Sequence, residues 1–122
     1  MDTQDIEINM DGQLEYIPGT KELYTGPSET HYENGKLWHS GQYEDGLMEG
    51  IWKYFYEDGQ LFMKMTFERG IMNGLTETFN ENGTPNLKGY SKNGKREGKW
   101  TTYKLDGSIE SEELFKDGVA IN

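Results

Sequence analysis

Two stretches of the chain gather carboxylates beside glycines, EDGLMEG at 44–50 and LDGSIESEE at 105–113. Carboxylate oxygens are the ligands that Ca²⁺ prefers, so both stretches are candidate calcium loops. Neither has the D-x-D-x-D-G-x₅-E order of such a loop, and neither shows the glycine-aspartate nonapeptide of calcium β-rolls. We therefore expect no metal site. These acids fit turns instead, where their side chains accept hydrogen bonds from the backbone.

The other chemistry-bearing residues are few. His31 and His39 are too few for a histidine metal cluster and have no evident catalytic companion. The absence of cysteine excludes disulfides, thiolate zinc sites and cysteine nucleophiles. A phosphate loop, a Rossmann glycine pattern and a nucleophile elbow are all missing. The sequence thus predicts a protein that is not an enzyme and needs no cofactor.

Charge indicates the class of partner. The one basic run is Lys92, Lys95, Arg96 and Lys99 beside Trp100; it could hold a phosphate, but a solvated turn is favoured in a chain of net charge −10. Residues 1–34 carry eight acids and one lysine. This acidity disfavours nucleic acid and anionic membranes. It suits a basic protein partner, although such a surface often serves only solubility.

No segment predicts export or membrane insertion. The start, MDTQDIEINMDGQ, has no basic and no apolar region of a signal peptide, and no stretch reaches about 18 apolar residues. We expect a cytoplasmic protein, and the oligomeric state is left open.

Glycines recur with a period of twenty-four, in three phase-locked series, which indicates a tandem repeat. The series are Gly35, Gly59, Gly83 and Gly107; Gly46, Gly70, Gly94 and Gly118; and Gly26, Gly50, Gly74 and Gly98. The period defines one repeat domain over 1–122. Its units are a degenerate one at 12–34, three full ones at 35–58, 59–82 and 83–106, and a partial one at 107–122; a flexible segment over 1–11 is allowed for.

Most of these glycines follow Asn or Asp between apolar stretches such as Ile51–Tyr56 and Leu61–Phe67. Asn-Gly and Asp-Gly are strong hairpin signals, because the turn needs positive φ. The predicted fold is all-β, with 24-residue hairpins extending one elongated, twisted antiparallel sheet. We expect the glycines of all three series, from Gly35 to Gly118, to serve turns.

The repeats also predict which face is packed. The columns 55/79/103, 37/61/85/109 and 43/67/91/115 share one parity and are mostly apolar, with Ser91 and Pro85 as exceptions. We take that parity as the packed face, which requires a three-residue loop that places Phe55 and Leu61 on the same side.

The other parity carries Trp38, Trp52, Tyr54, Tyr56, Phe62 and Trp100. These rings could simply stack between neighbouring units, because a row of repeats has no thick core. Alternatively Trp38, Trp52, Tyr54 and Phe62 form an exposed patch that binds a partner, with Trp100 as a further candidate, since Trp and Tyr are favoured binding anchors. The residues leave both readings open.

The unit GQYEDGLMEGIWKYFYEDGQL, echoed by GYSKNGKREGKWTTYKLDGSI, resembles the MORN-repeat variant over about residues 30–118. Chains of such units include the YwqK-type bacterial antitoxins, and this sequence is similar to them. The Gly50, Trp52, Phe55 and Gly59 set fits the pattern, whereas Thr76 stands where Trp is expected.

The resemblance implies a protein-binding antitoxin or immunity protein that covers the active site of a toxin, which could be a basic one. A structural or scaffolding repeat module that assembles proteins or itself is the alternative.

Overall fold

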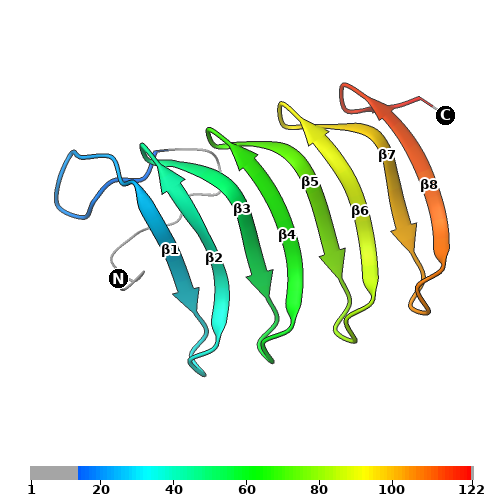
Figure 1. Ribbon diagram of the computed structural model, residues 1–122, viewed down its shortest axis with the longest axis horizontal. Helices are drawn as coiled ribbons and strands as arrows, with labels where there is room; N and C mark the ends of the chain where they lie inside the picture. Colours follow the sequence, from blue (N-terminus) through cyan, green and yellow to red (C-terminus); the bar gives the residue numbers. More distant parts are fainter. Residues whose placement is uncertain (1–13, 122) are drawn as a thin grey trace.

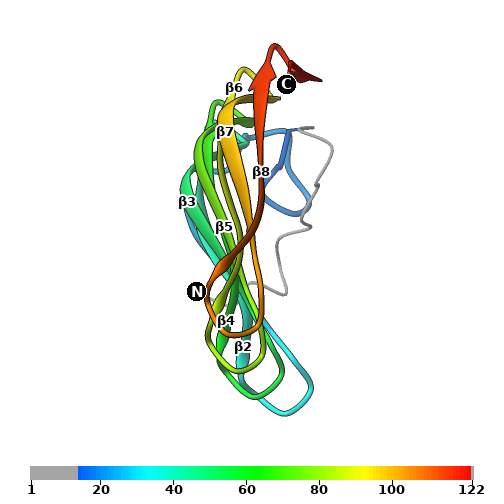
Figure 2. The ribbon, with the colours of Figure 1, turned by 90° about the vertical axis from the view of Figure 1, so that its right-hand side faces the viewer.

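The computed structural model describes residues 14–121, and within them the chain forms one open sheet of nine antiparallel strands in sequence order, without a helix. Figure 1 shows the strands side by side as an elongated row, and Figure 2 shows the twist of the sheet. The predicted all-β hairpin fold is confirmed. The strands are β1 (Gly26–His31), β2 (Leu37–Glu44), β3 (Leu47–Phe55), β4 (Leu61–Glu68), β5 (Ile71–Phe79), β6 (Pro85–Lys92), β7 (Lys95–Tyr103), β8 (Ile109–Lys116) and β9 (Val119–Ala120).

At one end of the strands, two-residue turns join each strand to the next. Asp45 and Gly46 have φ of 50° and 78°, and the same pair of positive angles recurs in each later unit. Two successive positive φ angles define a type I′ turn, whose twist matches that of the strands. The turn also binds the preceding unit, because the Gly46 amide donates to the Tyr24 carbonyl, and Gly70 repeats this bond to Met48. Each unit is therefore fastened to its neighbour beyond the strand ladder.

At the other end of the strands, three-residue loops join each strand to the next. The Tyr56 amide donates to the Gln60 carbonyl around a loop whose glycine, Gly59, has φ of 96°. The Asp58 carboxylate accepts the Gln60 amide at 2.9 Å, an Asx turn that explains the acid or amide before each loop glycine. Asn34, Asn82 and Asp106 accept the equivalent amide in their own loops. The predicted three-residue loop and the pairing of Phe55 with Leu61 are confirmed.

The third glycine series does not serve turns, which corrects the prediction for it. Gly50, Gly74 and Gly98 lie inside β3, β5 and β7, with φ of 75°, 134° and 74°. The hairpin that contains each of these glycines has two extra residues on the glycine's strand at that point, as opposite the step from Ser40 to Gln42. These glycines are bulge residues, for which the strand needs positive φ. Gly26, which begins the series, opens β1.

A second bulge corrects the predicted packed face. Tyr54 pairs with Met63 but Phe55 pairs with Leu61, so Phe62 is an extra residue in β4; Trp38, Asn86 and Glu110 are the corresponding extra residues. One extra residue exchanges the faces beyond it, whereas two extra residues do not. Phe55 and Leu61 therefore lie on the face opposite to Tyr43, although sequence parity puts them together.

The buried face, as we name it, carries Tyr43, Met48, Trp52, Tyr54, Met65 and Phe67, all largely buried. Of the predicted columns, 43/67/91 is buried here, including Ser91. The column 55/79/103 is only half-buried on the opposite face, as are Leu37, Leu61 and Pro85, while Ile109 is exposed. Trp52, Tyr54 and Trp100 belong to the buried face, so the parity that was expected to vary supplies much of the core.

Glycine makes room for the two buried indoles. A Cβ on Gly41 would lie 2.1 Å from Trp52 Cδ2, and a Cβ on Gly89 would lie 2.0 Å from Trp100 Cδ2. In the unit between them the same two positions hold Met65 and Thr76, which pair directly. Two units thus place an indole ring over a glycine, and the unit between them places Met65 beside the smaller Thr76. This exchange accounts for Gly41 standing where another unit has methionine.

The first, degenerate unit closes one end of the buried face. Tyr16 and Leu23 form a bridge, the Glu15 amide donates to the Gly46 carbonyl, and Tyr24 joins the core. Figure 2 shows this blue segment standing out to one side of the sheet. The flexibility expected for residues 1–11 lies outside the described residues.

Candidate protein-binding surface

The structure separates the five residues that the sequence nominates for partner binding. Trp52 is fully buried, and Tyr54 and Trp100 nearly so, whereas Trp38 is 43% exposed and Phe62 37%. The expected patch of Trp38, Trp52, Tyr54 and Phe62 is therefore not one exposed surface. Trp52 and Tyr54 are buried in the core, whereas Trp38 and Phe62 lie at the end of the strands that carries the three-residue loops. Partner binding by any of the five stays a prediction.

Trp38 and Phe62 each pack at a tilt against a tyrosine of the adjoining loop. The ring centroids are 5.9 Å apart for Tyr32 and Trp38, and 4.9 Å apart for Tyr56 and Phe62. The Trp38 ring also lies 4.6 Å from the ring of His39, because the bulge turns both side chains to the buried face. We call the four residues Tyr32, Trp38, Tyr56 and Phe62 the aromatic ridge. It is the rim of the buried face at which that face reaches solvent.

The two tyrosines are fixed in place by the next unit. The Tyr56 hydroxyl donates to the Phe79 carbonyl at 2.7 Å, and the Tyr32 hydroxyl donates in the same way to the Phe55 carbonyl. A side chain anchored at its tip loses little entropy when a partner covers its ring. The ridge is accordingly a pre-organised surface.

Carboxylates border the ridge. Tyr32, Tyr56, Glu57, Asp58 and Glu81 line a groove of about 430 Å³. Burial, and then the charge of Glu57, raises the pKa of Tyr32. Burial, and then Glu81 and Asp58, raises the pKa of Tyr56. Within residues 14–121, no lysine or arginine lies within 4 Å of the Glu57 or Glu81 carboxylate. The groove therefore combines two aromatic side chains with two glutamates that have no ion pair within the described part of the chain.

The ridge ends after two units. The positions of Tyr56 and Phe62 hold Asn80 and Asn86 in the next hairpin. Both amides make local hydrogen bonds, Asn80 to Thr84 and Asn86 to Thr78. The hairpin fold consequently does not require aromatic residues at these positions, which favours a role for them beyond folding.

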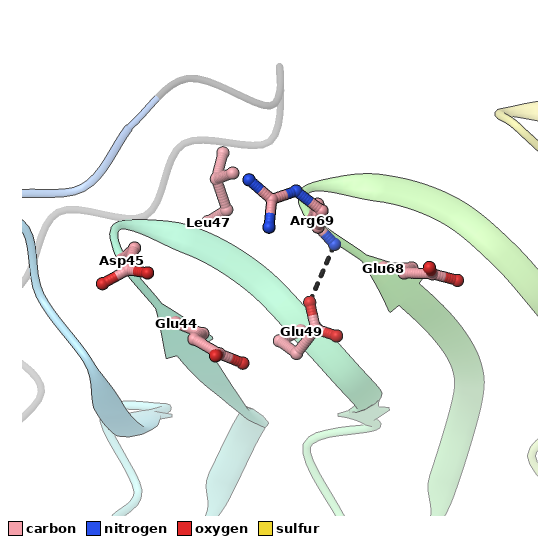
Figure 3. A pocket seen from close by; sticks show the side chains of 6 residues that line it. All are labelled: Glu44, Asp45, Leu47, Glu49, Glu68 and Arg69. Atoms are coloured by element: carbon pink, nitrogen blue, oxygen red, sulfur yellow. Dashed lines mark hydrogen bonds between the residues drawn. The ribbon is translucent and has the colours of Figure 1, made fainter.

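A second acidic groove lies at the opposite end of the strands, beside the two-residue turns. It measures about 260 Å³ and is lined by Glu44, Asp45, Leu47, Glu49, Glu68 and Arg69 (Figure 3). Glu49 has a structural task here, since its Oε2 accepts the Arg69 amide at 2.7 Å (Figure 3). Glu97 accepts the Asp117 amide in the same way. The bond repeats between units, so we assign Glu49 to fastening the repeats together.

The face opposite to the buried one, which we call the open face, presents apolar side chains among charges. Ile51 and Leu75 are exposed on neighbouring hairpins, and Tyr90 pairs directly with Leu75. Lys53 and Lys64 are opposite each other in the next row, an arrangement that is unfavourable in an isolated sheet. An open sheet face of this kind can also contact another protein.

His39 is buried among the Trp38, Trp52 and Tyr54 rings, and burial lowers its pKa to about 4. Its Nδ1 has no hydrogen-bond partner. Over residues 14–121, no three His, Cys, Asp or Glu side chains are grouped so as to hold a metal ion. The same part of the chain has no helix with the length and apolar character to cross a membrane.

Sequence reasoning does not nominate the two tyrosines of the ridge, or the glutamates that border it, for partner binding. The signal was present as two columns, Tyr32/Tyr56 and Glu33/Glu57/Glu81, both of which end before the last full unit is complete. Tyr56 falls within the predicted strand Ile51–Tyr56 and on the parity of Trp52, so the sequence does not distinguish it from the other rings of that parity.

Comparison with known proteins identifies the repeat. No curated protein matches the chain. The family model described as MORN repeat variant matches residues 24–45, 48–69 and 96–117, which together make up more than half of the chain. The chain belongs to the MORN repeat variant family.

Proposed function

We propose that this protein is a non-catalytic module that binds another protein, and that it acts as an inhibitor of antitoxin or immunity type. The observation that carries the proposal is the aromatic ridge with its bordering carboxylates. Aromatic anchors that are held in place and surrounded by polar groups are typical of the energetically important centre of an interface.

Charge supports an inhibitory role toward a basic protein. The net charge is −10, and the acids crowd the same end of the chain as the ridge. Complementary charge speeds the encounter with a basic partner and disfavours acidic ones. An inhibitor needs only to cover the working surface of its target, so it requires no catalytic group of its own. The proposal places this interaction in the cytoplasm.

A scaffold is the second candidate function, and the edges of the sheet favour it. β1 begins the sheet, and within residues 14–121 the outer side of β8 is covered by β9 at Phe115 and Lys116 and by the Ile121 amide, which donates to the Leu114 carbonyl. A strand edge can receive a strand from another chain. A MORN-type array could thus assemble proteins or pair with itself. Glu110, Glu112 and Glu113 on β8 oppose self-pairing, because like charges would meet.

Co-expression with the products of adjacent genes tests the proposal. The expected result is a stoichiometric complex with one neighbour, whose toxicity to the host cell is relieved by the full chain. A Trp38→Asn/Phe62→Asn variant should lose that relief. An Asn86→Ala variant, at the equivalent position of a later hairpin, should keep it. A chain that forms a defined oligomer by itself and relieves no neighbour's toxicity would contradict inhibition and favour the scaffold.

A further inference from the structure

We infer that the aromatic ridge receives two cationic side chains, Lys or Arg, about 10 Å apart on one amphipathic helix of the protein partner, whose apolar face rests on Trp38 and Phe62. This inference rests on the proposed function, since it names the chemistry of the partner. It commits to a basic helical segment, in preference to a nucleic acid, a lipid surface or a second copy of this acidic chain.

The ridge contains the same arrangement twice. Tyr32 lies beside Glu57 and Tyr56 lies beside Glu81, one repeat further along. A phenol face and a carboxylate together suit a cation, which gains cation–π attraction from the ring and an ion pair from the acid. The chain's own Lys36 is not among the residues that line the groove, and its Nζ donates to the Asp58 carbonyl at 3.1 Å.

The spacing follows from the sheet. Equivalent residues of successive units are two strands apart, and neighbouring strands are about 4.8 Å apart, so the two subsites lie about 10 Å apart. Residues i and i+7 of a helix lie on one face about 10.5 Å apart. Apolar residues at i+3 and i+4 would then face the Trp38 and Phe62 rings.

The protein already uses this contact within its own buried face. Arg96 lies over the Trp100 ring, with the guanidinium carbon 4.2 Å from the ring centroid, and it also approaches Phe115. Met48 and Met72 occupy the position of Arg96 in the earlier units. Arg96 thus shows that this sheet accommodates a guanidinium over an aromatic ring, and the two earlier units have no cation at its position.

Titration of the isotope-labelled full chain with a synthetic helical peptide, followed by NMR, tests the inference. The probe carries arginines at i and i+7 and leucines at i+3 and i+4, and the control peptide has the same composition with the arginines on opposite faces. We expect saturable shifts at 32, 38, 56–58, 62 and 81 with the probe, at least about fivefold tighter than with the control. The absence of saturable shifts at the ridge, or equal affinity for both peptides, would overturn the inference.

Charge reversals separate the ridge from general acidity. Glu57→Lys and Glu81→Lys should each weaken probe binding at least about fivefold, whereas Glu110→Lys, the same change on β8, should alter it less than about twofold. Equal weakening by all three would show that only net charge matters and would overturn the inference. If a neighbour-encoded partner binds the Glu57→Lys/Glu81→Lys variant as tightly as the wild type, the inference fails and the proposed function stands. If the probe binds as expected and no protein partner exists, the proposed function fails instead.

Discussion

Replacing Gly41 by alanine should destabilise the protein through a single clash with Trp52. The added Cβ would lie 2.1 Å from Trp52 Cδ2, while carbon atoms in contact lie about 3.5 Å or more apart, so the indole must withdraw by at least about 1.4 Å. The ring is fully buried, and its neighbours Tyr43 and Met65 are buried as well. Overpacking of this kind costs about 1–3 kcal/mol, and we expect the upper end.

A double-mutant cycle isolates that clash. Trp52→Thr alone should cost about 3–5 kcal/mol, by loss of a buried aromatic ring. In that background Gly41→Ala should be neutral or slightly stabilising, because glycine inside a strand costs about 0.5–1 kcal/mol relative to alanine. The unit that holds Met65 and Thr76 is the natural form of this combination.

The assay is urea unfolding at equilibrium, followed by far-ultraviolet circular dichroism so that the readout of unfolding does not depend on tryptophan fluorescence. Gly35→Ala is the matched control: its φ of 87° strains any side chain, but nothing lies within 4 Å of its Cβ, so its cost should be the same with and without Trp52. The reasoning is refuted if Gly41→Ala is as stable as the wild type, or if the costs of Gly41→Ala and Trp52→Thr simply add.

Three further outcomes follow from the contacts. Burial lowers the pKa of His39 from 6.5 to about 4, so between these pH values the unfolded chain binds a proton and the folded chain does not. The free energy of unfolding should therefore fall by about 3 kcal/mol between pH 6.5 and 4. Denaturation measured across this pH range should show a much smaller fall for His39→Gln. Tyr56→Phe should cost about 1 kcal/mol by thermal unfolding, since it removes the hydrogen bond to the Phe79 carbonyl, and an unchanged midpoint would contradict the assigned bond. Asp58→Ala should cost about 1 kcal/mol by loss of the bond from the Gln60 amide while Asp58→Asn should cost much less, a difference that urea denaturation of both variants can detect.

The repeat and its loops are predictable because turn chemistry is local. An Asp or Asn followed by glycine favours positive φ at that point, and the same dipeptide signal recurs every twenty-four residues. The loop of Phe55 and Leu61 was predictable for this reason. The series of Gly50 was misassigned because a bulge needs the same glycine conformation as a turn, and only the pairing of the next strand tells them apart.

The faces of the sheet could not be predicted by parity, because one extra residue reverses them. Phe62 is such a residue, yet its side chain looks like an ordinary strand residue in the sequence. A stronger signal was available in two columns read together: where Gly41 and Gly89 stand, Trp52 and Trp100 follow eleven residues later, and where Met65 stands, Thr76 follows. Paired substitution of that kind indicates contact even within one sequence, because the repeats serve as the comparison.

Two of the five residues nominated for partner binding have the exposure that a binding surface needs, and the binding itself stays a prediction. Trp38 and Phe62 are exposed as a binding surface requires, but Trp52 and Tyr54 are buried, and composition alone does not distinguish a stacking ring from an anchoring one. The acids were expected to steer a partner from 1–34, and part of that segment lies outside the described residues. Glu57 and Glu81, in the full repeats, are the acids that border the ridge.

Hydrogen–deuterium exchange of the full chain, alone and in complex with its co-expressed protein partner, tests the central claim that the first hairpins bind a protein through the aromatic ridge. Amides of 31–38 and 55–62 should be protected in the complex, and the equivalent loop at 103–110 should exchange as in the free chain. Protection at 103–110 with none at 31–38 and 55–62 would contradict the claim.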